Sequence, residues 1–203
     1  EWLTFCREDH QSMCGNNSNG MVPGLKVLDC RTGQLTPADP HSPYVALSYV
    51  WGEPTGEHLI RNADTDYMPK TIRDAMKVAL RLNFQYLWVD RYCIDQENPD
   101  EKRQMIASMG QIYTNAEITI IAVAGTNPEY GLPGVSSTPR RPQYAVKIGH
   151  ETHVLVMDPL EELNQSKWNS RGWTWQEMLL SRRRLAFSND QICFQCRDMH
   201  CLE

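Results

Sequence analysis

The sequence predicts an α/β fold in which a largely parallel sheet is covered by helices on both faces. Three apolar runs rich in β-branched and aromatic residues, Tyr44–Val50, Phe84–Asp90 and Glu117–Gly125, are interpreted as buried strands. Segments with helical periodicity separate them, and this alternation with continuously apolar strands is typical of a parallel sheet. A chain of 203 residues with ordinary globular composition is long enough for one compact domain.

The two helices between these strands have distinct start signals. Thr71 with Asp74 three residues later resembles a capping box. Apolar residues follow it at helical spacing: Ile72, Ala75, Met76, Ala79 and Leu80. The second helix is expected to be capped by Asn98, with Pro99 at its first position. Its predicted buried stripe, which is more typical of a core than of a cofactor site, consists of Met105, Met109, Ile112 and Tyr113.

The segments on either side of this core are less regular. Residues 1–43 contain turn-rich stretches around one apolar run, Leu25–Asp29, and are predicted to form an N-terminal extension of loops with a leader strand. Residues 44–203 are predicted to form the single α/β domain, with a loop and hairpin insert near 125–157.

The C-terminal third has hairpin and helix signals of its own. A hairpin is predicted over 144–157, turning near Gly149 and His150. A helix is expected over 173–180, and segments 183–188 and 191–196 are expected to pair as a terminal hairpin.

Composition and charge limit the class of partner. The net charge of −5 argues against general nucleic-acid binding, which depends on clustered Lys and Arg. The basic run Ser181–Leu185 is interpreted as a solvated helix end whose cations complement the helix dipole. No apolar stretch approaches the roughly 20 residues of a membrane span, and the first residues lack a signal-peptide pattern. A soluble cytoplasmic protein without membrane contact is therefore expected.

Seven cysteines, an odd number, favour free thiols in a reducing compartment over a disulfide framework. Cys193 and Cys196 form a C-x-x-C, with His200 and Cys201 close behind, a spacing that suits zinc. The same segment also has the pattern of a strand, in which cysteine serves as a small buried hydrophobe. This second interpretation is favoured, and no metal is assigned. A weaker zinc candidate combines Cys6, His10 and Cys14.

Two polar clusters follow the first two predicted strands, at the edge where ligands collect in open parallel sheets. The candidate binding residues are Ser48, Tyr49, Trp51 and Gly52 after the first strand, and Asp90, Arg91, Asp95 and Gln96 after the second. No Walker A, dinucleotide-binding or nucleophile-elbow motif is present, which disfavours P-loop hydrolysis, hydride transfer and serine catalysis. Asp90 and Asp95 form either a metal or acid/base pair, or loop carboxylates that bind backbone amides.

A third cluster is the heptapeptide RGWTWQE, Arg171 to Glu177. On a helix, Trp173 and Glu177 stand four residues apart and share a face, whereas Trp175 points elsewhere and is assigned to packing. A carboxylate beside an indole near the interior is partly desolvated, an environment typical of functional sites. Spacing alone nevertheless favours the solvated edge of a core helix for Glu177.

Three segments resemble the signature blocks of the fungal heterokaryon-incompatibility (HET) domain. They are YVALSYVWG, YLWVDRYCIDQ and RGWTWQEMLLS, in the family's order, and the resemblance spans roughly Tyr44 to Cys196. It implies a trigger of fungal cell death that acts in non-self recognition, usually as one domain of a larger protein.

HET domains are in turn similar to TIR domains, which have a flavodoxin-like parallel sheet and in many cases cleave NAD with a glutamate in a W-C-x-x-E-L pattern. Trp173 and Glu177 have that spacing here, although Thr174 replaces the Cys and Met178 the Leu. The resemblance implies that Glu177 is the catalytic carboxylate, that NAD or a related nucleotide is the substrate, and that neither metal nor cofactor is needed.

The same resemblance suggests roles for the neighbouring residues. The tryptophans and Tyr49 would stack on adenine or nicotinamide, and Arg91 or Arg171 would meet the pyrophosphate. It also implies homo-oligomerisation on activation. The alternative function is a non-catalytic homotypic adaptor that triggers cell death by recruitment.

Overall fold

A mixed eight-stranded sheet forms the centre of the molecule. The computed structural model describes residues 1–15, 20, 22–52, 68–154 and 158–203. Within them, the strand order is β10-β9-β8-β5-β3-β4-β1-β2. The parallel strands are β3 (Tyr44–Ser48), β4 (Tyr86–Val89), β5 (Ile118–Ala122) and β8 (Arg183–Phe187). The predicted α/β class, with helices flanking the sheet and additional C-terminal strands, is confirmed.

Across the sheet the four parallel strands follow the order β4-β3-β5-β8. Numbered by their order along the chain, this is second, first, third, fourth. This is the order of the first four strands of a flavodoxin-like doubly wound sheet. Antiparallel strands extend the sheet on both sides, with β9 (Ile192–Cys196) beyond β8 and β1 (Lys26–Asp29) beyond β4. The sheet is therefore parallel only at its centre, and similarity to TIR domains stays a prediction.

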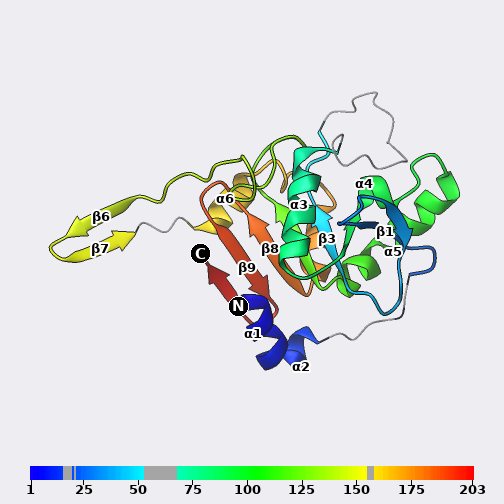
Figure 1. Ribbon diagram of the computed structural model, residues 1–203, viewed down its shortest axis with the longest axis horizontal. Coiled ribbons are helices and arrows are strands. Elements are labelled where there is room, and N and C mark those ends of the chain that lie inside the picture. The colour runs from blue at the N-terminus through cyan, green and yellow to red at the C-terminus, as the bar shows by residue number, and fades with distance from the viewer. Residues whose placement is uncertain (16–19, 21, 53–67, 155–157) are drawn as a thin grey trace.

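Right-handed crossovers determine which face each helix covers. Strand β4 lies on one side of β3 and β5 lies on the other, so the connections β3 to β4 and β4 to β5 run in opposite directions across the sheet. The helices in these two connections, α3 (Lys70–Arg81) and α5 (Pro99–Asn115), therefore cover opposite faces. Figure 1 shows α3 in front of the sheet. Helix α7 (Thr174–Leu180) packs against α5, where a Cβ on Gly110 would lie 3.0 Å from Leu180 Cδ1.

Helix α5 begins as the sequence predicts. The Asn98 side chain accepts hydrogen bonds from the backbone N–H groups of Asp100 and Glu101, and Pro99 occupies the first turn. The predicted stripe of Met105, Met109, Ile112 and Tyr113 is buried. None of the helices in the described ranges is long and apolar enough to cross a membrane.

The capping box predicted for α3 is wrong. The helix begins at Lys70 after Pro69, without a side-chain cap. Thr71 Oγ1 instead accepts from the Gly131 N–H (3.1 Å), and Asp74 Oδ2 accepts from the Leu132 N–H (3.0 Å). Both side chains are buried and accept hydrogen bonds from backbone N–H groups of a loop. These N–H groups need such acceptors because the loop does not pair with a strand.

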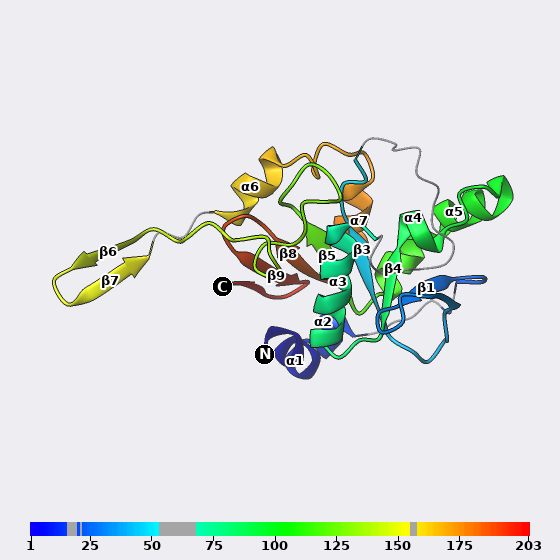
Figure 2. The ribbon, with the colours of Figure 1, turned by 45° about the horizontal axis from the view of Figure 1, so that its top comes forward.

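The N-terminal segment joins the rest of the fold. The predicted leader strand, β1, pairs with β4, and β2 (Leu35–Pro37) extends the sheet beyond it. Helices α1 (Trp2–Asp9) and α2 (Gln11–Cys14) lie beside the C-terminal strands, so the two chain ends are close together in both views (Figures 1 and 2).

Two hairpins appear where the sequence predicts them. Strands β6 (Ala145–Ile148) and β7 (Glu151–Val154) pair across Gly149 and stand away from the central sheet in Figure 1. Residues 155–157 of that prediction lie outside the described residues. Strands β8 and β9 form the second hairpin, and β10 (His200–Leu202) continues it. The sequence did not predict α6 (Pro159–Gln165) or the short α4 (Asp90–Cys93).

The basic run Ser181–Leu185 is not a solvated helix end. Arg182 and Arg183 are buried at the start of β8. Their guanidinium groups donate to the backbone carbonyl of Cys14, and Arg182 also reaches the carbonyls of Thr114 and Ala116. These carbonyls lie at the ends of α2 and α5, where helices leave acceptors without intrahelical partners. Arg184 is partly buried and donates to the Met178 carbonyl in the last turn of α7, which matches the expected contact with a helix end but not the expected solvation.

Candidate functional site

A pocket of about 420 Å³ lies at the carboxyl ends of β3 and β4. Its volume is typical of small-molecule sites, and its position is where ligands bind in open α/β sheets. Among the predicted candidates, those that line it are Trp51, Gly52, Asp90, Gln96, Arg171, Trp173 and Glu177. The structure therefore brings residues from all three sequence clusters to one cavity.

Glu177 lies at the inner wall of this pocket and is only 1% exposed. The start of α7 after Trp173 directs the side chain toward the end of β3. There the hydroxyl of Ser48, the last residue of β3, donates to Glu177 Oε2. The Ser48 oxygen in turn accepts a hydrogen bond from Trp168 Nε1 at 2.6 Å. A buried indole and a serine thus hold the carboxylate in one orientation.

The other carboxylate oxygen, Glu177 Oε1, receives no hydrogen bond from the described residues. The Arg171 guanidinium lies close by, with its Nη2 3.7 Å from Oε1. Arg171 is held there because its Nη1 donates to the backbone carbonyl of Tyr49. A buried acceptor without a hydrogen bond is costly, so its presence in a pocket wall calls for a functional explanation.

Asp90 is the second carboxylate of the pocket and is 7% exposed. It accepts hydrogen bonds from the Trp51 indole (3.0 and 3.1 Å) and from the Arg91 backbone N–H (2.7 Å). Burial and, second, the negative charge of Glu177 raise the pKa of Asp90 to about 7. Near neutral pH the pocket therefore contains a carboxyl group able to donate a hydrogen bond.

An asparagine at position 90 is expected to make stability less sensitive to pH. The pKa of Asp90 is about 7 in the folded chain and about 3.9 when unfolded, so its favourable contribution is complete below about pH 4 and is lost as the pH rises to about 7. Relative to wild type, Asp90→Asn should gain about 2–3 kcal/mol in free energy of unfolding between pH 5 and pH 8. Urea unfolding at both pH values measures this difference.

Asp100→Asn is the matched control, since its side chain is 88% exposed on α5. The control should follow the pH dependence of the wild type. Parallel pH profiles for Asp90→Asn and wild type would show that Asp90 ionises normally in the folded chain.

Two indoles border the pocket. Trp51 is fixed by Asp90 and by Arg91, whose guanidinium lies 5.9 Å from the centre of the Trp51 ring and donates to the Trp51 carbonyl at 3.2 Å. Arg91 itself does not line the pocket and packs on Trp51. Trp173, about half exposed, is the second indole. Tyr49 is buried behind the pocket and contributes its carbonyl to Arg171.

The remaining candidates make contacts within the protein. Asp95 does not line the pocket, and its Oδ1 accepts from the Glu97 N–H at 3.0 Å, as the loop-carboxylate interpretation expects. Gln96 lines the pocket while its Nε2 donates to the Asp90 and Ile94 carbonyls. Gly52 has φ = +78°, and a Cβ there would lie 2.8 Å from Pro128 Cδ, so this turn requires glycine.

Sequence reasoning did not assign Trp168, Lys102 or Tyr113 to the site. Trp168 lies in a turn without periodicity, so nothing local distinguishes its buried indole. Lys102 lines the pocket from α5, where a helical lysine is usually a surface residue. Tyr113 was assigned to the core and is fully buried; burial and, second, the negative charge of Glu177 raise the pKa of its phenol.

Comparison with known families gives one match to a family model, described as "Heterokaryon incompatibility protein (HET)", over residues 44–177. The matched range includes Ser48, Asp90 and Glu177. The chain is also 27% identical over 159 residues to "Heterokaryon incompatibility protein 6, OR allele" of Neurospora crassa. That alignment covers 68% of the chain but 22% of the relative, so the chain corresponds to a small part of that protein. No solved structure matches the chain.

Proposed function

Because the chain belongs to the heterokaryon incompatibility (HET) family, we propose that it acts in fungal non-self recognition and triggers cell death by cleaving NAD or a related nucleotide. Glu177 is the proposed catalytic carboxylate. The role in incompatibility is supported by the family and by the name of the Neurospora relative. The enzymatic part rests on the geometry of Glu177 in its pocket.

One observation carries the enzymatic proposal: Glu177 is buried, and one of its oxygens is held by Ser48 while the other has no hydrogen bond within the described residues. A carboxylate with a purely structural role is expected to have both oxygens satisfied. The second oxygen is itself buried, but it belongs to a residue of the pocket wall, so a small movement of the side chain would present it to a hydroxyl or a developing positive charge on a ligand.

The chemistry of nicotinamide release suits one ionised carboxylate. As the bond between ribose C1′ and the nicotinamide nitrogen breaks, its electron pair leaves with nicotinamide, which departs neutral and needs no acid. Positive charge develops on the ribose, and water then adds to C1′ and loses a proton. Glu177 would stabilise that charge and accept the proton, as carboxylates do in glycoside hydrolysis. Protonated Asp90 would donate a hydrogen bond to a ribose hydroxyl.

The rest of the pocket supports a nucleotide ligand. Trp51 and Trp173 offer flat apolar surfaces on which an adenine or nicotinamide ring would stack. Arg171 and Lys102 bring two cations to the same cavity, and cations of this kind bind pyrophosphate oxygens. Arg91, the other arginine that the sequence suggested for this role, packs on Trp51 and does not line the pocket.

A homotypic adaptor is the second candidate function, and the exposed face of α7 favours it. Trp173, Trp175 and Leu179 are 51%, 65% and 63% exposed. The assignment of Trp175 to packing is therefore wrong, because α7 presents this indole together with Leu179 away from the sheet. Exposed aromatic residues in a group are typical of protein interfaces.

Incubation of the concentrated chain with NAD tests the proposal. Chromatography should detect nicotinamide and ADP-ribose in equal amounts, and the rate per chain should rise with protein concentration if assembly completes the site. Absence of nicotinamide release at concentrations where light scattering shows self-association would reject the enzymatic proposal and favour the adaptor.

A further inference from the structure

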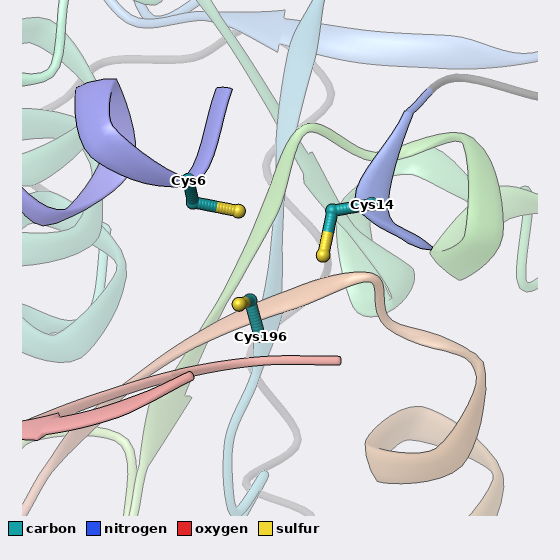
Figure 3. Close-up of side chains that lie close together, drawn as sticks. All are labelled: Cys6, Cys14 and Cys196. Atoms are coloured by element: carbon teal, nitrogen blue, oxygen red, sulfur yellow. The ribbon is translucent and has the colours of Figure 1, made fainter. Parts of the chain in front are cut away.

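Three cysteines from distant parts of the chain meet beneath the N-terminal helices. Cys6 lies on α1, Cys14 on α2 and Cys196 at the end of β9, and all three are buried. Their sulfur atoms lie within 4.8 Å of one another. Figure 3 shows the three thiols pointing into one common space.

His10 lies between the two N-terminal cysteines and extends this group. Its Nδ1 lies 3.4 Å from Cys196 Sγ, and its Nε2 lies 3.3 Å from Asp198 Oδ2. A carboxylate that holds one ring nitrogen while the other faces sulfur is the arrangement usual for metal-bound histidines. The side chain of His10 is only 12% exposed.

The spacing of the three sulfurs is compatible with a tetrahedral zinc site. Zn–S bonds of about 2.3 Å and Zn–N bonds of about 2.0–2.1 Å give a tetrahedron with S···S edges of about 3.8 Å and S···N edges of about 3.6 Å. The observed 3.4 Å between His10 Nδ1 and Cys196 Sγ is close to such an edge, and the three sulfurs lie within 4.8 Å of one another. His10 is outside that group of three, so its ring would have to move toward Cys6 and Cys14 to complete the tetrahedron.

Hydrogen-bond donors surround two of the three sulfurs. The backbone N–H groups of Asp198 and Met199 point at Cys196 Sγ, at 3.4 and 3.2 Å, and Arg183 Nε donates to Cys6 Sγ at 3.2 Å. Three thiolates and one Zn²⁺ carry a net charge of −1. The Asp198 carboxylate beside His10 adds a further negative charge, and the buried guanidinium of Arg183, which also pairs with Glu117, offsets part of the total.

Cys6 and Cys14 are the residues through which the two N-terminal helices enter the core. Cys6 is the buried residue of α1, and Cys14 is the buried residue of α2. Helices of eight and four residues are marginal by themselves. A bond between their thiols and Cys196 would therefore provide the main attachment of residues 1–14 to the sheet.

We propose that Cys6, His10, Cys14 and Cys196 bind one structural Zn²⁺ that fastens the N-terminal helices to β9. Thiolate and imidazole donors select zinc among common divalent ions. The C-x-x-C pair does not act together, because residues three apart in a strand point to opposite faces. Cys196 turns toward α1 and α2, while Cys193 lies opposite Leu202 of β10.

Zinc content and cobalt spectroscopy of the purified chain test this site. Elemental analysis should find one zinc per chain. Replacement by Co²⁺ should give tetrahedral d–d bands together with thiolate-to-cobalt charge transfer. Cys6→Ser and Cys14→Ser should each weaken zinc binding by at least about tenfold. Cys193→Ser and Cys201→Ser, matched thiol losses on the neighbouring strands, should retain zinc.

Alkylation of the wild-type chain gives a readout that does not depend on the folding of variants. Cys6, Cys14 and Cys196 should resist iodoacetamide until a chelator is added. A chain without zinc or a tetrahedral cobalt spectrum overturns the proposal, as does a disulfide between two of the three thiols or loss of zinc only in Cys193→Ser. An unchanged cobalt spectrum in His10→Ala would overturn the assignment of the fourth ligand.

Discussion

Glutamine at position 177 is expected to lower the rate of nicotinamide release from NAD by about 10³-fold while the chain stays folded. Glutamine has the shape of glutamate, and its amide oxygen still accepts the Ser48 hydrogen bond that holds Oε2. The amide lacks negative charge, so it neither stabilises a positive ribose nor takes a proton from water. The loss should therefore appear in the chemical step rather than in folding.

Chromatographic measurement of nicotinamide, with thermal unfolding of the same samples, separates these effects. Glu151→Gln is the matched control: it removes one carboxylate in the same way, but from a side chain that is 82% exposed on β7. Both variants are purified identically, so a contaminating activity would affect both equally. Equal release by Glu177→Gln and Glu151→Gln would remove Glu177 from the chemistry.

The midpoint of thermal unfolding gives independent information on Glu177. Burial of a charge whose second oxygen is not hydrogen-bonded costs free energy, so the glutamine variant should unfold at the same temperature as wild type or higher. A large decrease in that temperature would instead indicate that Glu177 is retained for structure.

Local sequence patterns predict the centre of this fold well. The strands β3, β4 and β5 are continuously apolar because both of their faces are covered, and such runs are visible without tertiary information. The start of α5 at Asn98 and Pro99 is equally local, since a cap requires only its own first turn. The rule that ligands collect at strand ends then brought Trp51 and Asp90 into one predicted site, and the structure places both in one pocket.

Contacts between distant segments explain most of what the sequence did not reveal. The hydrogen bond from Trp168 to Ser48 joins a turn to the end of β3, and neither segment contains a pattern that names its partner. The zinc candidates were incomplete for the same reason, because each local set contained only part of the group that the fold assembles from Cys6, Cys14 and Cys196. The prediction that Ser181–Leu185 is solvated was wrong because it relied on charge alone. The acceptors that allow Arg182 to be buried come from other helices.

Methionine in place of Arg182 is expected to reduce the free energy of unfolding by about 3–5 kcal/mol. The guanidinium is 2% exposed and donates to three backbone carbonyls, those of Thr114 (2.9 Å), Cys14 (3.2 Å) and Ala116 (3.2 Å). It also lies 3.5 Å from Glu117 Oε1. Methionine fills much of the volume but leaves these acceptors without their donor, and the cost of buried unsatisfied acceptors dominates.

Urea unfolding followed by tryptophan fluorescence measures this loss, with Arg103→Met as the matched control. Arg103 is 78% exposed on α5 and pairs with Asp100, so its replacement should change stability by at most about 0.5 kcal/mol. Arg182→Lys keeps the charge but replaces a planar fork by a single point donor, so its stability should lie between those of wild type and Arg182→Met. If Arg182→Met is as stable as Arg103→Met, the ends of α2 and α5 do not depend on this guanidinium. The expected order, wild type above Arg182→Lys above Arg182→Met, would instead show that the fork geometry itself, and not the charge alone, joins α2 to the end of α5.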